Sequence, residues 1–437
     1  MKRTTMFTRL VASAAALGMT FGMAACGAAD ASDGKTADGK VQITLSWWGS
    51  EKRLKLTQQA VELFEQKHPN IKVNMENSDY GGYFDKLNIS IAGGTAPDVF
   101  QIGTDHIPVY GSQGSLMDLS QVSDALDLTQ MTDAVRATGQ FGGVQYAAPV
   151  SLTSLGIAVN NTVLKDLGLT LPADADSWTW DEFEAFERQI VEKSNGEITA
   201  AGTPLGTYGL QLWARQHGEE LFKDGKVSVS KKVATSYFEE FKKAVDEQLI
   251  GTADRWAENQ NANTEISDAG TGKQAMLFTH ATQLSAFSAA SGTEDWSLVM
   301  VPTDTPQTKF MYNRMSMSWA VSAQSKHPKE AAELLDFMIN DLDAAKILGT
   351  ERGIPANPKV REVAKQNASD IEKKVMDFVD KTEKASGIAP PDTPNGVSDS
   401  DNYIMRCAQD IAFGSKTPEQ AAQSYIDDLT NSIASAS

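Results

Sequence analysis

The fold is decided by the stretch VQITLSWWGSEKRLKLTQQAVELFEQKHPNIKV, residues 41–73. Residues 41–45 alternate apolar and polar side chains, which is typical of a β-strand. Residues 54–64 then place Leu, Thr, Val and Phe at i, i+3, i+7 and i+10, the spacing of one helix face. Pro69 ends this helix, and a two-residue period returns at residues 71–75. The stretch is therefore predicted to be a βαβ unit.

Two adjacent tryptophans, Trp47 and Trp48, stand in the first βα turn of this unit. In open α/β sheets, ligands bind beyond the carboxyl ends of the strands. We therefore expect an aromatic residue here to meet a ligand. Core packing is the alternative for each tryptophan, because large aromatic side chains are often buried. Neighbours in an extended chain point to opposite sides, so at most one of the two packs in the core.

The first 25 residues predict a lipoprotein signal peptide. A basic start precedes an apolar run at residues 10–21, which is too short to anchor the chain in a membrane by itself. The run ends in Met-Ala-Ala-Cys, which resembles a lipobox with Met where Leu is usual. We expect Cys26 to carry lipid, and ordinary signal cleavage at an Ala-x-Ala-like site is the alternative. Residues 26–40 are mostly small and polar, which predicts a flexible tether.

The chain is long and strongly acidic. Its 437 residues include 57 Asp and Glu against 39 Lys and Arg, a formal net charge of −18. The length favours two domains, and the charge argues against binding nucleic acid or anionic lipid. No second run is apolar enough to span a bilayer, so the lipid anchor is the one membrane contact expected. Cys407 is the only other cysteine, so no internal disulfide is expected, and we interpret Cys407 as a buried thiol in a helix.

Polar loops follow several predicted strands. The apolar residues 99–102 lead directly into the loop 103–106, Gly-Thr-Asp-His. Residues 155–159 are a fully apolar predicted strand, and residues 275–279 form a strand that delivers His280.

Helix signals are clear in two further places. Thr179 and Glu182 match a capping box, which predicts a helix that starts at Thr179. Residues 331–348 have the apolar spacing of one amphipathic helix.

Signals for catalysis are weak. The five histidines lie far apart without metal-ligand spacing, and neither His-Glu-x-x-His nor Gly-x-Ser-x-Gly occurs. Residues 270–275 match a relaxed dinucleotide fingerprint, but they precede a predicted strand where the motif has to follow one. We therefore expect no catalytic residue, no metal and no cofactor. The many carboxylates leave a glycosidase pair open as an alternative.

Aromatic and polar residues gather instead at the predicted strand ends. Sugars present an apolar C–H face and a rim of hydroxyls, so they suit aromatic platforms beside a few directed polar groups. This pattern predicts a carbohydrate ligand. The residues that form it are Trp47, Trp48, Thr104, Asp105, His106, Trp213 and His280.

A series of short motifs covers nearly the whole chain after residue 40. They include Trp47-Trp48-Gly49, Pro97-Asp98-Val99, Tyr146-Ala147-x-Pro149, Trp178-Thr179-Trp180-Asp181-Glu182, Gly272-Lys273-x-Ala275-Met276 and Gly353-Ile354-Pro355. In this order, and behind a lipobox, the motifs resemble the extracellular solute-binding proteins of ATP-driven importers. Within that family the similarity is to the cluster that includes the maltose-binding protein.

The resemblance implies an α/β protein with the two-lobe, periplasmic-binding-protein-like fold of type II. Three crossover segments are expected to join the lobes, near residues 146–149, 301–303 and 352–355, with the ligand cleft between the lobes. The implied boundaries are 41–147 and 303–353 for lobe 1, and 148–302 and 354–437 for lobe 2.

The ligand loops of the family match four places in this chain. They are the first βα turn, the loop after Pro97-Asp98-Val99, the segment after Tyr146, and the end of the strand at residues 275–279. The predicted ligand-binding residues are therefore Trp47, Trp48, Thr104, Asp105, His106, Ser151, Thr153, Trp213, Thr279, His280, Arg314 and Trp319.

The resemblance also implies a function. We expect a monomeric lipoprotein on the outer face of the cytoplasmic membrane, which captures an oligosaccharide and delivers it to the permease subunits of an ABC importer. Two alternatives stay open. One is a surface hydrolase or lyase that acts on the same sugars. The other is a binder of an anionic solute, for which Arg314 is the one cationic residue in the predicted loops.

Overall fold

The computed structural model describes residues 36, 39–306, 308–387 and 389–436. Cys26, the signal peptide and most of the tether lie outside these residues, so what we expect of them stays a prediction. Among the described helices, none combines the length and the apolar character that crossing a bilayer requires.

The predicted βαβ unit is confirmed. β1 (Val41–Trp48) and β2 (Ile71–Ser78) pair in parallel along their whole length, and α1 (Glu51–Lys67) connects them. The helix begins after Ser50, whose hydroxyl accepts a hydrogen bond from the Arg53 amide at 3.3 Å. Its apolar face buries Val61 and Phe64 against the sheet side of the lobe. The structure therefore contains the unit that the local sequence pattern predicts.

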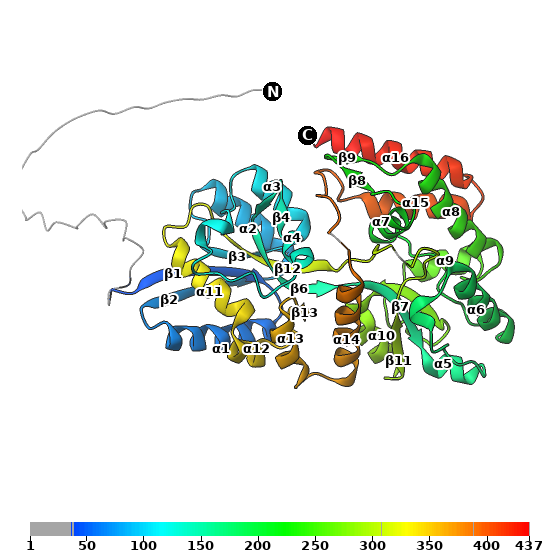
Figure 1. Ribbon diagram of the computed structural model, residues 1–437, viewed down its shortest axis with the longest axis horizontal. Coiled ribbons are helices and arrows are strands. Elements are labelled where there is room, and N and C mark those ends of the chain that lie inside the picture. The colour runs from blue at the N-terminus through cyan, green and yellow to red at the C-terminus, as the bar shows by residue number, and fades with distance from the viewer. Residues whose placement is uncertain (1–35, 37–38, 307, 388, 437) are drawn as a thin grey trace, which may run out of the picture.

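A six-stranded mixed sheet organises the first lobe. β1 pairs with its neighbours in parallel, whereas the long central strand β12 is antiparallel to the strands on both its sides. In spatial order the strands are β13 (Ile354–Pro355), β6 (Ala147–Thr153), β12 (Arg314–Val321), β3 (Val99–Ile102), β1 and β2. The helices around this sheet in Figure 1 are α1, α2 (Tyr80–Ala92), α3 (Ile107–Ser112), α4 (Asp133–Ala137), α11 (Pro328–Asn340), α12 (Leu342–Leu348) and α13 (Pro358–Lys365).

A three-stranded antiparallel sheet organises the second lobe. Its central strand is β7 (Leu155–Asn160), which is buried along its whole length, as its apolar sequence predicts. β10 (Met276–His280) and β11 (Trp296–Val299) pair on its two sides. The helices of this half in Figure 1 are α5 (Asn161–Asp166), α6 (Trp180–Lys193), α7 (Thr207–Gln216), α8 (Lys231–Asp246), α9 (Ala253–Gln260), α10 (Leu284–Ser291), α14 (Asp370–Ala385), α15 (Ser400–Ala412) and α16 (Pro418–Ser435). Two short hairpins complete the strands, β4 (Gln140–Phe141) with β5 (Val144–Gln145) and β8 (Phe222–Lys223) with β9 (Lys226–Val227).

We propose lobe boundaries that lie later in the chain than the implied ones, on the basis of strand pairing and core packing. β6 stays paired with β12 as far as Thr153, so the first crossing lies at Ser154. Residues 310–312 still pack in the core of the second lobe, so the second crossing ends at Arg314. β13 and α13 remain with the first lobe, and α14 packs against both α13 and β11. The boundaries that we now propose follow this pairing, because backbone hydrogen bonds hold β6 and β13 in the large sheet.

Side-chain caps explain one departure from the predicted helices. The helix expected over residues 331–348 is divided into α11 and α12, because the Asp341 carboxylate accepts hydrogen bonds from two amides of α12, both at 2.9 Å. The capping box of α6 is confirmed, since the Thr179 hydroxyl accepts from the Glu182 amide and the Glu182 carboxylate accepts from the Thr179 amide.

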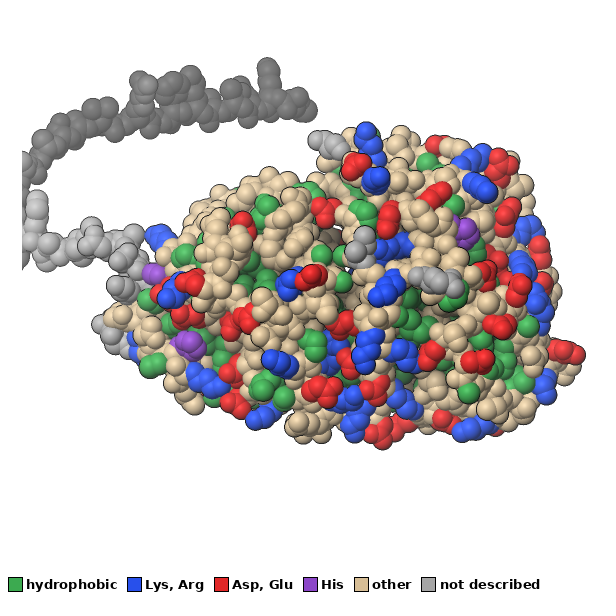
Figure 2. Space-filling view, in the orientation of Figure 1, with side chains coloured by type: hydrophobic (Ala, Val, Ile, Leu, Met, Phe, Trp, Pro, Cys, Tyr) green, Lys and Arg blue, Asp and Glu red, His purple; other side chains and the backbone are tan. Residues whose placement is uncertain are grey.

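The surface is charged but mixed in sign. On the face shown in Figure 2, acidic and basic side chains are interspersed over both lobes.

The prediction for Cys407 is confirmed. The residue is buried in α15, and its thiol donates to the carbonyl of Ala421 at 3.3 Å.

Candidate ligand-binding site

A cavity of about 400 Å³ opens between the two lobes. Its volume lies within the range of small-molecule sites in proteins. The first lobe contributes the ends of β1, β3 and β6 and the start of β12, and the second lobe contributes the end of β10. The lining residues are Trp48, Tyr80, Phe84, Gly103, Thr104, Asp105, His106, Thr153, His280, Thr282, Gln283, Arg314, Met315, Ser316 and Met317.

Three aromatic residues form one wall of the cavity. Trp48 ends β1, and Tyr80 and Phe84 lie one turn apart at the start of α2. The ring centroid of Trp48 is 5.6 Å from that of Tyr80 and 5.5 Å from that of Phe84. Tyr83, which is buried, supports Trp48 from the core side at 5.1 Å. The wall is thus held from behind and presents apolar ring surface that suits the C–H face of a sugar.

A carboxylate and an imidazole lie beside this wall, after the end of β3. The His106 ring stacks on Phe84, with centroids 3.8 Å apart and planes inclined by 8°. Its Nδ1 lies 3.0 Å from Oδ1 of Asp105. Partial burial raises the pKa of Asp105, but His106 and, more weakly, Arg314 outweigh it and lower the pKa below the usual value. Asp105 is therefore ionised at neutral pH and offers acceptor oxygens to ligand hydroxyls.

Arg314 and His280 supply further donors to the cavity. Arg314 is exposed at the start of β12, and its guanidinium makes no hydrogen bond or ion pair to the rest of the described chain. Burial lowers the pKa of His280, and the charge of Arg314 lowers it further. His280 is therefore neutral at physiological pH. Its Nδ1 is buried without a hydrogen-bond partner among the described residues.

The backbone of β12 is irregular where it passes the cavity. Its pairing with β6 shifts twice between Met315 and Ser318, so Ser316 faces no partner in the ladder. Such bulges change the direction of side chains and often lie next to binding sites. The Thr104 hydroxyl donates to the carbonyl of Met315 at 3.0 Å. This bond ties the loop after β3 to the bulge.

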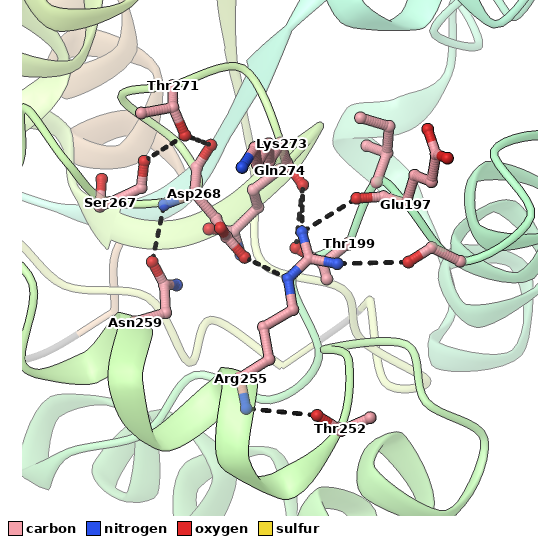
Figure 3. A network of polar contacts seen from close by, with 12 residues as sticks. Glu197, Thr199, Thr252, Arg255, Asn259, Ser267, Asp268, Thr271, Lys273 and Gln274 are labelled. Atoms are coloured by element: carbon pink, nitrogen blue, oxygen red, sulfur yellow. Dashed lines mark hydrogen bonds and ion pairs between the residues drawn. The ribbon is translucent and has the colours of Figure 1, made fainter.

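Polar contacts hold both ends of the strand that delivers His280. Figure 3 shows Arg255 of α9 at the loop before β10, where it donates to the Asp268 carboxylate at 2.8 Å and to the Lys273 carbonyl at 3.2 Å. Beyond the other end of β10, the hydroxyl oxygens of Thr282 and Thr153 lie 3.2 Å apart. β10 is therefore anchored in its own lobe and touches the first lobe at the cavity.

The structure brings seven of the twelve predicted binding residues to this cavity. They are Trp48, Thr104, Asp105, His106, Thr153, His280 and Arg314. Ser151 and Thr279 are absent from its lining, and Ser151 is fully buried in β6.

Three predicted tryptophans are corrected to core residues. Trp47 and Trp319 have 0 % of their surface exposed, because alternate side chains of a central strand enter the core. Trp213 packs in the core of the second lobe, where its Nε1 donates to the Ser236 hydroxyl at 3.0 Å. Large aromatic side chains in loops and near strand ends serve packing as often as binding, and burial separates the two uses.

Several lining residues were missed in the sequence. Tyr80 and Phe84 line the cavity but are not among the predicted binding residues. The signal that could have found both is position, because α2 begins directly after β2, at the sheet edge where Trp48 ends β1. The bulge at Ser316 has no comparable signal in the sequence.

Within the described residues, no group of three or more His, Cys, Asp or Glu side chains is placed to hold a metal ion. The polar groups of the cavity are instead single donors and acceptors from different elements. This arrangement suits hydrogen bonds to a neutral or weakly charged ligand.

Comparisons with known proteins point to one family. Residues 48–343 match the family described as bacterial extracellular solute-binding protein. The diacetylchitobiose binding protein DasA of Streptomyces coelicolor is 30% identical over 227 residues, which are 51% of this chain and 52% of that protein. The maltodextrin-binding protein MdxE of Bacillus subtilis is 22% identical over 430 residues, 95% of this chain and 94% of its own. The match to DasA thus spans about half of each chain.

Solved structures have the same fold. A periplasmic oligogalacturonide binding protein from Yersinia enterocolitica gives a TM-score of 0.78 at 22% identity, covering 91% of this chain and 100% of that one. At this identity the likeness shows the fold alone. It confirms the predicted two-lobe, periplasmic-binding-protein-like fold of type II.

Proposed function

Because the chain belongs to the bacterial extracellular solute-binding protein family, we propose that it captures a carbohydrate outside the cell and delivers it to an ABC importer. The family is one of solute-binding proteins rather than enzymes. We therefore propose binding without turnover, with the permease subunits of the importer as partners of the loaded protein.

The observation that carries the carbohydrate proposal is the division of the cavity into an aromatic wall and a polar side. Trp48 offers a ring face, and Asp105 offers a carboxylate beside it. Arg314 and His280 add hydrogen-bond donors to the lining. A sugar has matching surfaces, an apolar face and hydroxyls that both donate and accept. Asp105 is exposed in the open cavity, and covering its carboxylate with a ligand is costly unless it receives hydrogen bonds, which sugar hydroxyls can donate.

The names of two relatives support an oligosaccharide. One is named for diacetylchitobiose and the other for maltodextrin, and both ligands consist of linked sugar rings. Because these sugars differ, the relatives favour the class of ligand and leave the particular sugar to experiment.

We further propose that Cys26 carries the lipid anchor and that residues 26–40 form the tether to the outer face of the cytoplasmic membrane. The basic start, the short apolar run and the small residues before Cys26 support this. The family description as extracellular agrees with a location outside the cell.

A glycan array tests the carbohydrate proposal. The mature chain with Cys26→Ser is applied to an array of oligosaccharides that differ in sugar and linkage. Each sugar that binds is then incubated with the protein in solution, and the mixture is assayed for new reducing ends. Binding of an oligosaccharide without new ends is expected. Turnover would favour the enzyme, and failure to bind any glycan would contradict the proposal.

An anionic ligand is the second candidate, and Arg314 is the observation that favours it. This exposed cation forms no close ion pair with a described residue, and burying it under a ligand costs free energy unless the ligand supplies an anion. A charged ligand predicts that affinity collapses in Arg314→Gln and weakens with salt. A neutral sugar predicts little effect of salt.

A further inference from the structure

We propose that Arg53 is a positioning residue that holds Trp48 and the bulge of β12 in the geometry needed for ligand binding. Arg53 lies in the first turn of α1 and does not line the cavity. It acts on the ligand through the residues that it holds. The inference rests on the proposed function, because it takes the cavity as the ligand-binding site.

One guanidinium joins three separate segments behind the cavity. Nη1 of Arg53 donates to the carbonyl of Trp48 at 3.0 Å and lies 3.8 Å from Sδ of Met317. Nη2 donates to the carbonyl of Glu351 at 3.0 Å, and Nε lies 3.7 Å from the Glu351 carboxylate. The end of β1, the bulge of β12 and the turn before β13 are therefore tied to one side chain.

The local sequence makes room for this side chain. Gly49 lies against it, because a Cβ built at Gly49 would come within 2.3 Å of Cδ of Arg53. Ser50 caps α1 through the Arg53 amide, which sets where the side chain leaves the helix. Gly49 and Ser50, which follow the two tryptophans, thus allow the Arg53 side chain to reach the Trp48 carbonyl at the end of β1.

The burial of Arg53 argues for a geometric role. The residue is 9% exposed, and burial lowers its pKa while Glu351 raises it. A buried cation is a weak source of stability, because desolvation offsets its attraction to a partner. A planar guanidinium with donors in a fixed fork can, however, reach two carbonyls and a carboxylate at once, which a lysine cannot. What Arg53 supplies is therefore a fixed distance between Trp48 and the segments around it.

Met317 is held from a second direction as well. Nε2 of Gln101 lies 3.5 Å from its Sδ. Gln101 in turn accepts a hydrogen bond from Nε of Arg352 at 3.2 Å, and Nη2 of Arg352 donates to the Thr57 hydroxyl at 2.8 Å. The bulge is thus contacted by Arg53 directly and linked to Arg352 through Gln101. Without Arg53, Trp48 loses the support at its carbonyl, and its ring remains present but shifts relative to Met317.

A readout without ligand tests the position of Trp48 directly. The whole protein, with Cys26→Ser, is labelled with 5-fluorotryptophan, and the ¹⁹F resonance of Trp48 is assigned with Trp48→Phe. Arg53→Lys keeps the charge and removes the fork. The Trp48 resonance is expected to shift or broaden in Arg53→Lys, while the resonance of Trp213 in the other lobe stays in place.

Arg361→Lys is the matched control. Arg361 is also buried, with 1% of its side chain exposed, and it donates to the carbonyl of Pro355 at 2.9 Å, away from Trp48. This variant is expected to lower the melting temperature and leave the Trp48 resonance unchanged. An unchanged Trp48 resonance in folded Arg53→Lys would overturn the proposal. An equal shift in both variants would also overturn it, because general loosening would then be the cause.

A double-mutant cycle tests whether Arg53 acts through Trp48, with maltotriose and diacetylchitobiose as the probes in calorimetry. We expect Arg53→Lys to weaken binding roughly tenfold, within the range of couplings between contacting residues, and to have no further effect in Trp48→Ala. Additive losses would overturn the positioning role. If neither sugar binds the parent protein, the proposed function loses support, and the ¹⁹F experiment still decides the position of Trp48.

Discussion

Replacing Trp48 by Ala is expected to weaken oligosaccharide binding roughly ten- to a hundredfold. Trp48 lines the cavity at the end of β1 and is supported from behind by Tyr83. The substitution removes the ring face that we place against a sugar. Its effect on folding is expected to be moderate, since one side of the ring faces the cavity.

The magnitude follows from the area that a sugar can cover. An aromatic side chain buries about 150–250 Å² in all, and roughly half of this belongs to one face. At about 25 cal/mol per Å², that half contributes about 2–3 kcal/mol. Tyr80 and Phe84 already cover part of the ring, so about 1.4–2.8 kcal/mol is expected, which corresponds to roughly ten- to a hundredfold in Kd.

Trp47 is the matched control, because it is the same residue type one position earlier. It has 0 % of its surface exposed and packs in the core of the first lobe. Trp47→Ala is therefore expected to cost about 3–5 kcal/mol of folding free energy and to leave the affinity of the folded fraction unchanged. The two neighbours should thus show opposite patterns.

Calorimetric titration with the sugar chosen by the glycan array is combined with urea unfolding for each variant. The reasoning is refuted if Trp48→Ala binds as tightly as the parent protein. It is also refuted if Trp47→Ala, measured while folded, loses as much affinity as Trp48→Ala, because the assignment of one residue to the core and one to the cavity would then be wrong.

Three further outcomes are expected. Asp105→Asn should weaken sugar binding by roughly ten- to a hundredfold, since a hydrogen bond to a charged group contributes about 1.5–3 kcal/mol. Calorimetry compares this variant with Asp118→Asn, which changes a carboxylate outside the cavity lining. An equal loss of affinity in both variants would contradict the prediction. The lowered pKa of His280 means that the unfolded chain binds a proton more readily than the folded one, so His280 should make stability fall as the pH drops below 6.5. His280→Gln should reduce this slope in thermal melts, and an unchanged slope would contradict the prediction. A ligand that contacts both lobes should favour a closed form, so the radius of gyration from small-angle scattering should decrease at saturation, and an unchanged radius would count against a site between the lobes.

The location of the lipid anchor has a direct test in cells. Cys26→Ser should release the protein from the membrane fraction, because the substitution removes the thiol that we propose carries the lipid. Retention of the variant in the membrane fraction would mean that Cys26 is not the anchor.

Local chemistry explains why much of the fold could be predicted. The βαβ unit of residues 41–73, the buried strand β7 and the capping box at Thr179 depend on neighbours within a few residues, and all three are confirmed. The family prediction is confirmed as well, because its motifs are short segments in a fixed order. The apolar spacing of residues 331–348 predicted one helix, and this was wrong because the Asp341 side chain caps a second helix within that range.

The cavity required the tertiary structure. The sequence determined that aromatic and polar residues stand at strand ends, and it placed Trp47 and Trp48 at the first of these. It could not decide between the two tryptophans, because the direction of each side chain depends on which face of β1 the rest of the lobe covers. The bulge at Ser316 depends likewise on pairing with β6. Arg53 meets Glu351 across 298 residues of chain, and no pattern of neighbouring residues records such a contact, because only packing of the folded lobe brings these segments together.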